Sequence, residues 1–373
     1  MKPPPAAPTL SGDQRLAWLR LIRTPGIGPI TFRELLNHFG SATDALAALP
    51  ELAKKSGRPV RVFTADAAER ELADAAAIGA RFVATGEGGY PPWLAAVDGA
   101  PPLIAIRGGS AVLAGPAVAI VGSRNASIAG QKLAAEIAAG LTDAGFVIVS
   151  GLARGIDAAA HRASLATGTV AVFAGGLDRP YPPDNVPLAD AIIEHGGAHV
   201  SEMPMGHEPR AKDFPRRNRI ISGMALAVVI VEAALRSGSL ITARLAAEQG
   251  RLVFAVPGSP LDPRAAGANR LIRDGATIVT SIADIVAEIS PMLERPAPRP
   301  SAREPPPDER PVLDADDSDR ARIVAALGPA PVAIDEIIRF TGIAAPVVRL
   351  VLLELDLAGR IEHHPGGRVA LLA

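Results

Sequence analysis

The chain has 373 residues, and its 38 basic and 39 acidic side chains give a formal net charge of −1, so any affinity for nucleic acid must come from a local basic patch. The length allows two or three domains, and the absence of cysteine excludes disulfides, thiol chemistry and cysteine-ligated zinc. No apolar run is long enough to span a membrane and no secretory signal opens the chain, so we expect a cytoplasmic protein with no membrane contact.

The N-terminal part predicts a tail followed by a small helical domain. Residues 1–10 are rich in proline, which is typical of a disordered tail. Residues 11–60 have helical apolar spacing, interrupted by a Thr-Pro-Gly-Ile-Gly-Pro turn at residues 24–29. Two helices around such a turn resemble a helix-hairpin-helix, whose turn amides can hold a DNA phosphate. Pro29 removes one of these amides, so we favour a packing role for the turn.

Residues 61–84 are expected to connect this domain to the next one. Within them we predict a helix from Ala65 to Ala77 and a strand over residues 81–84. A further strand is predicted over residues 103–106, in the domain that follows.

Two β-loop-α units in succession are predicted over residues 118–165. The β-branched run 118–121 is followed by a loop of Gly122, Ser123 and Arg124, and the run 146–149 by a loop that starts with Ser150 and Gly151. Such units form parallel sheets with right-handed crossovers, and the loops at the carboxyl ends of the strands line the ligand crevice. Because glycine turns and helix N-termini accommodate anions, these loops indicate phosphate binding.

The strand pattern continues to residue 280 and predicts the fold class. We expect an α/β protein whose main domain, residues 85–292, is an extended Rossmann-like, mostly parallel sheet. The further predicted strands are 170–173, 198–200, 226–231, 252–256 and 277–280.

The C-terminal part predicts a linker and a second small domain. Residues 293–317 are rich in proline and charge, which is typical of a linker. Residues 318–373 predict three helices and a β-hairpin, which together resemble a winged helix. The third helix, residues 344–358, carries only Arg349 as a cation, so we favour protein docking over DNA reading for this domain.

A basic segment at residues 207–219, HEPRAKDFPRRNR, has an excess of three positive charges. Cations around an aromatic ring are typical of single-stranded nucleic-acid sites, because the cations pair with phosphates and the ring stacks on an unpaired base. Alternatively, the segment is a solvated basic face with its ring buried in the core. The candidate binding residues are Lys212, Phe214, Arg217, Asn218 and Arg219.

No catalytic constellation is predicted. Asp157 and His161 lie on one face of a helix, but a capping carboxylate and a packed imidazole explain them without a metal. No Walker lysine follows Gly122, and none of the loop serines lies in a nucleophile elbow. We therefore expect no catalytic activity, no metal and no cofactor.

Six motifs in order resemble the bacterial DNA-processing protein A family, DprA, also called Smf. The resemblance covers almost the whole sheet domain. It implies an extended Rossmann-like domain that binds single-stranded DNA, forms a homodimer and helps to load the RecA recombinase during natural transformation, flanked by a helical domain of sterile-alpha-motif type and a winged helix. The motifs are VAIVGSR (118–124), SGLARGID with its histidine, His161 (150–161), GGLDRPYP (175–182), FPRRNRIIS (214–222), VVIVEAALRSGSLITA (228–243) and VFAVPG (253–258).

By motif, the resemblance implies that Arg124 is the DNA-binding arginine of the glycine loop. It also places the lysine and the aromatic residue of a second loop on or near Lys212 and Phe214, and an Arg-Asn-Arg run on residues 217–219. With the glycine-loop residues Gly122, Ser123, Ser150 and Gly151, these form the predicted single-stranded DNA site.

Two alternatives remain open from the sequence. Similar folds include nucleoside-monophosphate phosphoribohydrolases, but the corresponding loop here, residues 236–243, lacks their glutamate. The other alternative is an adaptor that acts through its two terminal domains.

Overall fold

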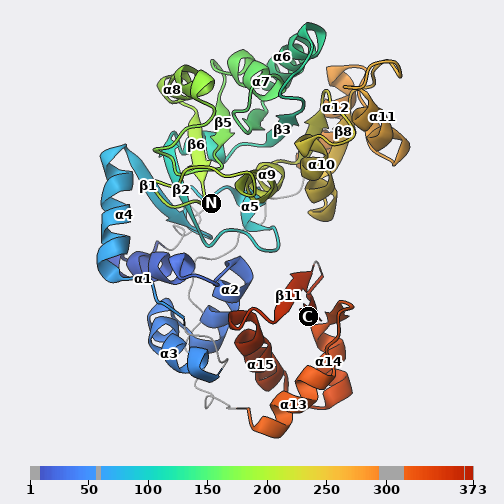
Figure 1. The fold of residues 1–373 in the computed structure, drawn as a ribbon. Coiled ribbons are helices and arrows are strands. Elements are labelled where there is room, and N and C mark those ends of the chain that lie inside the picture. The colour runs from blue at the N-terminus through green and yellow to red at the C-terminus, as the bar shows by residue number, and fades with distance from the viewer. Residues whose placement is uncertain (1–8, 56–59, 294–314, 365, 373) are drawn as a thin grey trace, which may run out of the picture. The chain divides into compact units, whose positions relative to one another are not determined.

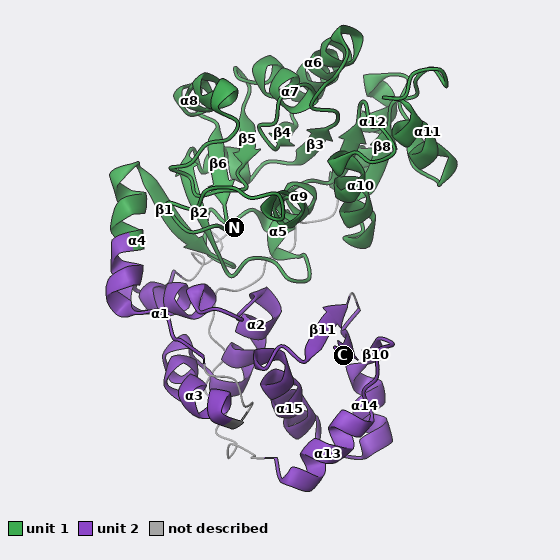
Figure 2. Cartoon of the chain, viewed as in Figure 1, with its two compact units in different colours: residues 1–8, 71–301 green, residues 9–70, 302–373 purple. Residues whose placement is uncertain are grey.

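The computed structural model describes residues 9–55, 60–293, 315–364 and 366–372 (Figure 1). The chain forms two compact units (Figure 2). The sheet unit comprises residues 1–8 and 71–301, and the terminal unit comprises residues 9–70 and 302–373. Most of the expected tail and linker lies outside the described residues. None of the helices in the described ranges combines the length and apolarity that a membrane span requires.

A nine-stranded sheet is the centre of the sheet unit, with the order β1-β2-β6-β5-β4-β3-β7-β8-β9. In this order, all neighbouring pairs from β6 to β9 are parallel. At the other edge, β2 pairs antiparallel with β6 and β1 pairs antiparallel with β2. The strands are β1 (Ala80–Ala84), β2 (Leu103–Gly108), β3 (Ala117–Val121), β4 (Val147–Ser150), β5 (Thr169–Val172), β6 (Ala198–Ser201), β7 (Ala227–Ile230), β8 (Leu252–Ala255) and β9 (Thr277–Ile278).

The predicted α/β class and every predicted strand of the sheet are confirmed. The strand predicted within the connecting region 61–84 is β1, which belongs to the sheet. This strand pairs along its whole length with β2, and its Phe82 and Val83 are buried. An edge strand with two large apolar side chains gains more from joining the sheet than from remaining in a connector.

Helices cover both faces of the sheet, which explains why its central strands are apolar throughout. Along β3, Val118 and Ile120 belong to one buried cluster, while Ala119 and Val121 belong to the other. Helices α6, α7 and α12 contribute to the first cluster, and α5, α9 and α10 to the second. The helices are α4 (Ala65–Ala77), α5 (Pro92–Ala95), α6 (Ile128–Asp143), α7 (Ile156–Ala163), α8 (Val186–Glu194), α9 (Asp213–Met224), α10 (Gly238–Glu248), α11 (Ala266–Arg273) and α12 (Ile282–Leu293).

The order of the strands creates a switch point beside β3. The chain runs outward from β3 through β4, β5 and β6, and then returns to place β7 on the other side of β3. Loops that leave adjacent strands in opposite directions open a crevice at the carboxyl edge of the sheet. This edge is therefore where a ligand site is expected.

The described N-terminal part of the terminal unit contains the helices α1, α2 and α3 and the start of α4. Ser11 opens the first one with a capping box, in which its side chain accepts from the amide of Gln14 and the Gln14 side chain accepts from the amide of Ser11. Pro29 lies at the first position of the second helix, where no amide donor is needed. The helices are α1 (Gly12–Arg23), α2 (Pro29–Phe39) and α3 (Ala42–Lys55).

The C-terminal part of the terminal unit has the helices and hairpin of a winged helix. Helix α15 is buried along most of its length, with Val348 and Val351 in the core of the winged helix. It also packs on α2 and α3, where the Thr31 hydroxyl donates to Asp356 over 2.6 Å. The elements are α13 (Asp317–Ala325), β10 (Val332–Ala333), α14 (Ile334–Thr341), α15 (Ala345–Leu357), β11 (Ile361–His364) and β12 (Arg368–Leu371).

Candidate nucleic-acid interface

The loop after β3 is held in place by the loop after β4. Gly155 has a φ of 75°, and a Cβ on it would collide with the carbonyl oxygen of Ser123. The amide of Ile156 donates to the same oxygen over 3.3 Å. Gly122 is equally tight, because a Cβ there would lie 2.6 Å from the Ile156 side chain. These glycines therefore let two loops pack together, and the packing directs the next side chain, Arg124, outward into solvent.

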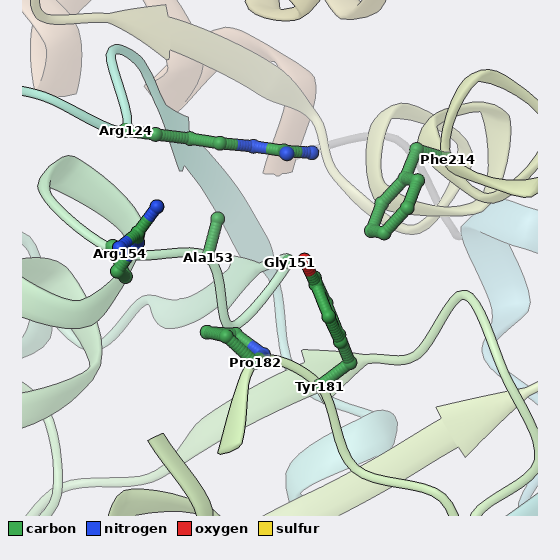
Figure 3. Close-up of a pocket in the computed structure, with 7 residues that line it drawn as sticks. All are labelled: Arg124, Gly151, Ala153, Arg154, Tyr181, Pro182 and Phe214. Carbon is green, nitrogen blue, oxygen red and sulfur yellow. The ribbon is translucent and has the colours of Figure 1, made fainter. Parts of the chain in front are cut away.

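Four segments meet in a small pocket at this edge of the sheet (Figure 3). Arg124 comes from the loop after β3, Gly151 and Arg154 from the loop after β4, Tyr181 from the loop after β5, and Phe214 from the first turn of α9. We call this the switch-point pocket. Its full lining is Arg124, Gly151, Ala153, Arg154, Tyr181, Pro182 and Phe214.

Two aromatic rings and a guanidinium group are in contact in the switch-point pocket. The guanidinium carbon of Arg124 lies 4.8 Å from the centroid of the Phe214 ring, which is a cation–π distance. The rings of Tyr181 and Phe214 meet edge to face, with centroids 5.6 Å apart. Within the described residues, Arg124 has no carboxylate partner, so its charge is available to an anionic ligand.

Arg217 is buried beneath this pocket, only 5% exposed, although the sequence suggested a phosphate contact. Its guanidinium donates to the carbonyl oxygens of Gly151, over 2.7 Å, and of Val172, and so joins the ends of β4 and β5. Asp157 lies nearby and accepts from the amides of Gly151 and Ala153. Arg217 therefore holds together the loops that line the pocket, and its guanidinium is buried among backbone carbonyls.

Ser150 and Gly151, which were predicted to contact a phosphate, form hydrogen bonds within the protein. The Ser150 side chain is fully buried, and its hydroxyl donates to the carbonyl of Ile120 over 2.6 Å. The amide of Gly151 donates to Asp157, and its carbonyl accepts from Arg217. Neither residue offers a free donor, so their contribution is to bring the loop after β4 close to Arg217.

The other predicted residues of α9 point in separate directions. Lys212 is exposed at the N-cap of the helix but is not among the residues that line the pocket. The Asn218 amide donates to the carbonyl of Gly238 over 3.4 Å. Arg219 donates to the carbonyl of Gly99 over 2.7 Å and forms an ion pair with the buried carboxylate of Glu202. Of the cluster predicted from the basic segment, only Phe214 lines the pocket.

Sequence reasoning missed Arg154 and Tyr181 as lining residues. Both lie in motifs that were recognised, SGLARGID and GGLDRPYP, and both follow strands of the parallel sheet. Arg154 is exposed and lies 4.0 Å from the carboxylate of Asp184, which is a weak surface pair. The missed signal was that both lie in loops that leave the carboxyl ends of β4 and β5, which places their side chains at the same edge as Arg124.

The N-terminus of α6, where a nucleotide phosphate would bind in many Rossmann-like proteins, already holds a carboxylate. Ser127 donates its amide, over 2.9 Å, and its hydroxyl to the side chain of Glu232. A Cβ on Gly130 would lie 2.5 Å from the same carboxylate. An internal anion at this point disfavours a second one, which argues against the phosphoribohydrolase alternative.

The predicted Asp157 and His161 lie apart in their contacts: Asp157 accepts from backbone amides, and His161 is buried in the core. Within the described ranges, no three histidine or acidic side chains are grouped closely enough to hold a metal ion. His161 is fully buried and contacts the Thr169 hydroxyl over 2.8 Å, and burial lowers its pKa to about 3. It is therefore a neutral core side chain at ordinary pH.

This domain architecture, a Rossmann-like sheet with a helix-hairpin-helix domain and a winged helix, is that of DNA-processing proteins. The chain belongs to the DNA recombination-mediator protein A family, whose profile matches residues 81–290. The profile of the N-terminal helix-hairpin-helix domain of DprA-like proteins matches residues 12–74, and that of the DprA winged helix matches residues 296–367. The resemblance to the DprA/Smf family is confirmed.

Individual relatives agree with this assignment. Protein Smf of Escherichia coli is 40% identical over 284 residues, which are 76% of this chain and 75% of that protein. The X-ray structure of DprA from Streptococcus pneumoniae covers 75% of this chain and 99% of its own, with 36% identity and a TM-score of 0.61. A structure of DprA from Helicobacter pylori, described for its single-stranded DNA binding mode, covers 55% of this chain and 93% of its own, with 29% identity and a TM-score of 0.50.

Proposed function

We propose that the chain is a sequence-independent single-stranded DNA-binding protein whose binding site is centred on the switch-point pocket. The observation that carries the proposal is the exposed Arg124, without a carboxylate partner in the described chain, next to two aromatic rings at the carboxyl edge of the sheet. A cation beside accessible aromatic rings suits a phosphate followed by an unpaired base. The single-stranded DNA binding described for the Helicobacter pylori relative supports the same ligand class.

The proposed contacts differ from those predicted from the sequence. Arg124 and Arg154 hold phosphates, while the exposed Lys212 extends the positive surface next to the pocket. Gly122, Ser123, Ser150, Gly151 and the buried Arg217 shape the site without contacting the ligand. Affinity then comes from charge and stacking, which explains a low sequence preference.

The further steps follow from family membership and are part of the same proposal. We propose that the chain acts as a homodimer in the cytoplasm, binds DNA that enters during natural transformation and helps to load the RecA recombinase on it. The proposal includes no catalytic step, metal or cofactor. Size measurement in solution tests the dimer, and RecA assembly on oligonucleotides coated with single-strand-binding protein tests the loading step.

The experiment that tests DNA binding compares Arg124→Ala with Arg244→Ala, a surface arginine of α10 that is 68% exposed. Arg124→Ala should bind a single-stranded oligonucleotide much more weakly, and its plot of log K against log salt should be shallower by about 0.7 because one phosphate contact is lost. Arg244→Ala should behave like the unaltered chain, and both should melt normally. Unchanged affinity in a folded Arg124→Ala variant would contradict the proposed site.

A further inference from the structure

Helix α15 of the terminal unit carries a row of leucines outside the core of the winged helix. Leu350, Leu353 and Leu357 are buried, 3–4% exposed, but do not belong to that core. We call these three side chains the leucine stripe. Leu353 lies one turn before Asp356, which contacts α2, and α2 and α3 both pack on α15 (Figure 2). The N-terminal helices therefore cover the stripe, and the winged helix alone would expose it.

His38 lies on the face of α2 that meets α15. Thr31 and Glu34 precede it by seven and four residues, so the three side chains share that face. The Thr31 hydroxyl donates to Asp356 over 2.6 Å, and the carboxylate of Glu34 lies 3.9 Å from Arg349. Nε2 of His38 is buried and has no hydrogen-bond partner in the described chain. Protonation of this ring would therefore place a charge in the interface without an acceptor at Nε2.

The carboxylates near His38 do not compensate for its burial. Burial lowers the pKa of His38 below its ordinary value of 6.5, although the negative charges of Glu34 and Glu354 oppose this shift. Both carboxylates already face a cation, because Glu354 accepts two hydrogen bonds of 2.9 Å from Arg320 and Glu34 lies near Arg349. The charged and titratable groups of the packed elements are Glu34 on α2, Asp44 and the Glu51–Lys54 pair on α3, Arg349, Glu354 and Asp356 on α15, Arg320 on α13 and His363 on β11.

We propose that the packing of α15 on α2 and α3 is a latch that opens when His38 is protonated, and that its opening exposes the leucine stripe. In the open state His38 is in contact with solvent, where it binds a proton more readily than in the closed state. The balance therefore shifts toward the open state as the pH falls below about 6.5, by at most about tenfold per pH unit for one proton. The latch lies in the terminal unit and does not depend on the proposed DNA site.

The test measures how fast a thiol reagent reaches a single cysteine placed in the stripe, which is possible because the chain has no other cysteine. Leu353→Cys is compared with Phe340→Cys, whose site on α14 is 78% exposed. Dividing the first rate by the second removes the effect of pH on the thiol itself. The ratio should be low at pH 7.5 and should rise by up to about tenfold between pH 6.5 and 5.5.

The role of His38 is tested in the same Leu353→Cys and Phe340→Cys chains. His38→Gln cannot take up the proton, so its ratio should stay constant with pH. His195→Gln, at an exposed histidine of the sheet unit, is the matched control and should keep the rise. Leu141→Cys, at a fully buried site in the sheet unit, reports unfolding of the whole chain and should stay unreactive at each pH.

Hydrogen exchange of the unaltered chain needs no variant to fold. After correction for the intrinsic effect of pH, α2 and α15 should be less protected at pH 5.5 than at pH 7.5, while β3 stays protected. Three results would overturn the latch: a ratio that does not change with pH, a rise that is equal in His38→Gln, and a loss of protection in the sheet unit at the same pH. Each of them would leave single-stranded DNA binding, and so the proposed function, unaffected.

Discussion

At the scale of single residues, the Arg217 side chain brings a positive charge into the interior of the sheet unit. Burial lowers its pKa to about 10, and the carboxylate of Asp157 opposes that shift. A Cβ on Gly151 would collide with the guanidinium, so glycine is required opposite this arginine. Arg217 thus joins β4, β5 and α9 directly below the switch-point pocket.

This arrangement predicts that Arg217→Ala acts on stability and not on the phosphate contacts. The change removes the side-chain donor to the buried carbonyls of Gly151 and Val172 and the positive charge near Asp157, so the free energy of unfolding should fall by about 3–5 kcal/mol. The salt slope of DNA binding should stay the same for the fraction that is folded. Denaturation and salt-dependent binding, measured beside Arg124→Ala, check both statements. A normal melting curve with a shallower salt slope would contradict them.

His161 predicts a pH dependence of stability. Thr169 donates to the carbonyl of Ile148, so Nδ1 of His161 donates to the Thr169 hydroxyl and the ring is neutral. Burial first, and then the positive fields of His199 and Arg217, lower its pKa to about 3. Below pH 6.5 the unfolded chain takes up a proton that the folded chain does not. The free energy of unfolding should therefore fall as the pH is lowered, by up to about 1.4 kcal/mol per pH unit.

The measurement for His161 is the free energy of unfolding between pH 7.5 and 5. His161→Asn lacks the titrating ring, so its stability should depend less steeply on pH than that of the unaltered chain. His195→Asn, at an exposed histidine whose ring contacts a backbone carbonyl, is the matched control and should keep the original slope. Equal slopes in all three proteins would show that His161 does not titrate on unfolding.

At the scale of elements, the N-terminus of α6 is closed by Glu232 from the end of β7. Glu232→Ala removes the acceptor for the amide and hydroxyl of Ser127, so the free energy of unfolding should fall by about 1–3 kcal/mol. The vacated helix end can then attract an anion. Inorganic phosphate should therefore raise the melting temperature of Glu232→Ala more than that of the unaltered chain. Equal shifts in both would indicate that the carboxylate does not occupy an anion site.

At the scale of the whole molecule, the two ends of the chain combine in the terminal unit. Helix α15, the third helix of the winged helix, is covered by α2 and α3, and Arg349 lies 3.9 Å from Glu34. A recognition helix has to enter the major groove, and a helix covered in this way is not free to do so. Helix α15 thus packs on the N-terminal helices of the same unit.

Because the chain has no cysteine, a disulfide can test this docking directly. Thr31→Cys with Asp356→Cys replaces two side chains whose oxygens lie 2.6 Å apart, so mild oxidation should give an internally crosslinked species on a non-reducing gel. The crosslinked protein should bind single-stranded DNA as well as the reduced one, because α15 is not part of the proposed binding site. Thr31→Cys with Phe340→Cys, on the exposed side of α14, should not crosslink.

Two results would contradict the docking of α15. One is the absence of the internal crosslink in the Thr31–Asp356 pair while the single variants remain folded. The other is a loss of DNA affinity on oxidation that reduction restores, which would show that α15 must be released for binding.

The sequence alone was enough to predict the strands and helices of this protein and to identify its family. Short β-branched runs between glycine loops predicted all nine strands of the sheet, and helical spacing predicted the winged-helix core. These signals are local, because a strand buried on both faces needs an apolar run and a helix needs a period of 3.6 residues. Ordered motifs in the same loops were enough to identify the family.

Only the tertiary structure decided which charged side chains line the switch-point pocket. In α9 the side chains of Arg217, Asn218 and Arg219 follow one another in sequence but point to the interior, to Gly238 and to Glu202. Successive residues of a helix are about 100° apart, so a run of cations cannot all face one pocket. Tyr181 and Arg154 instead reach Arg124 from strands that are adjacent only in the folded sheet, because strand order and loop packing are set by contacts between distant residues.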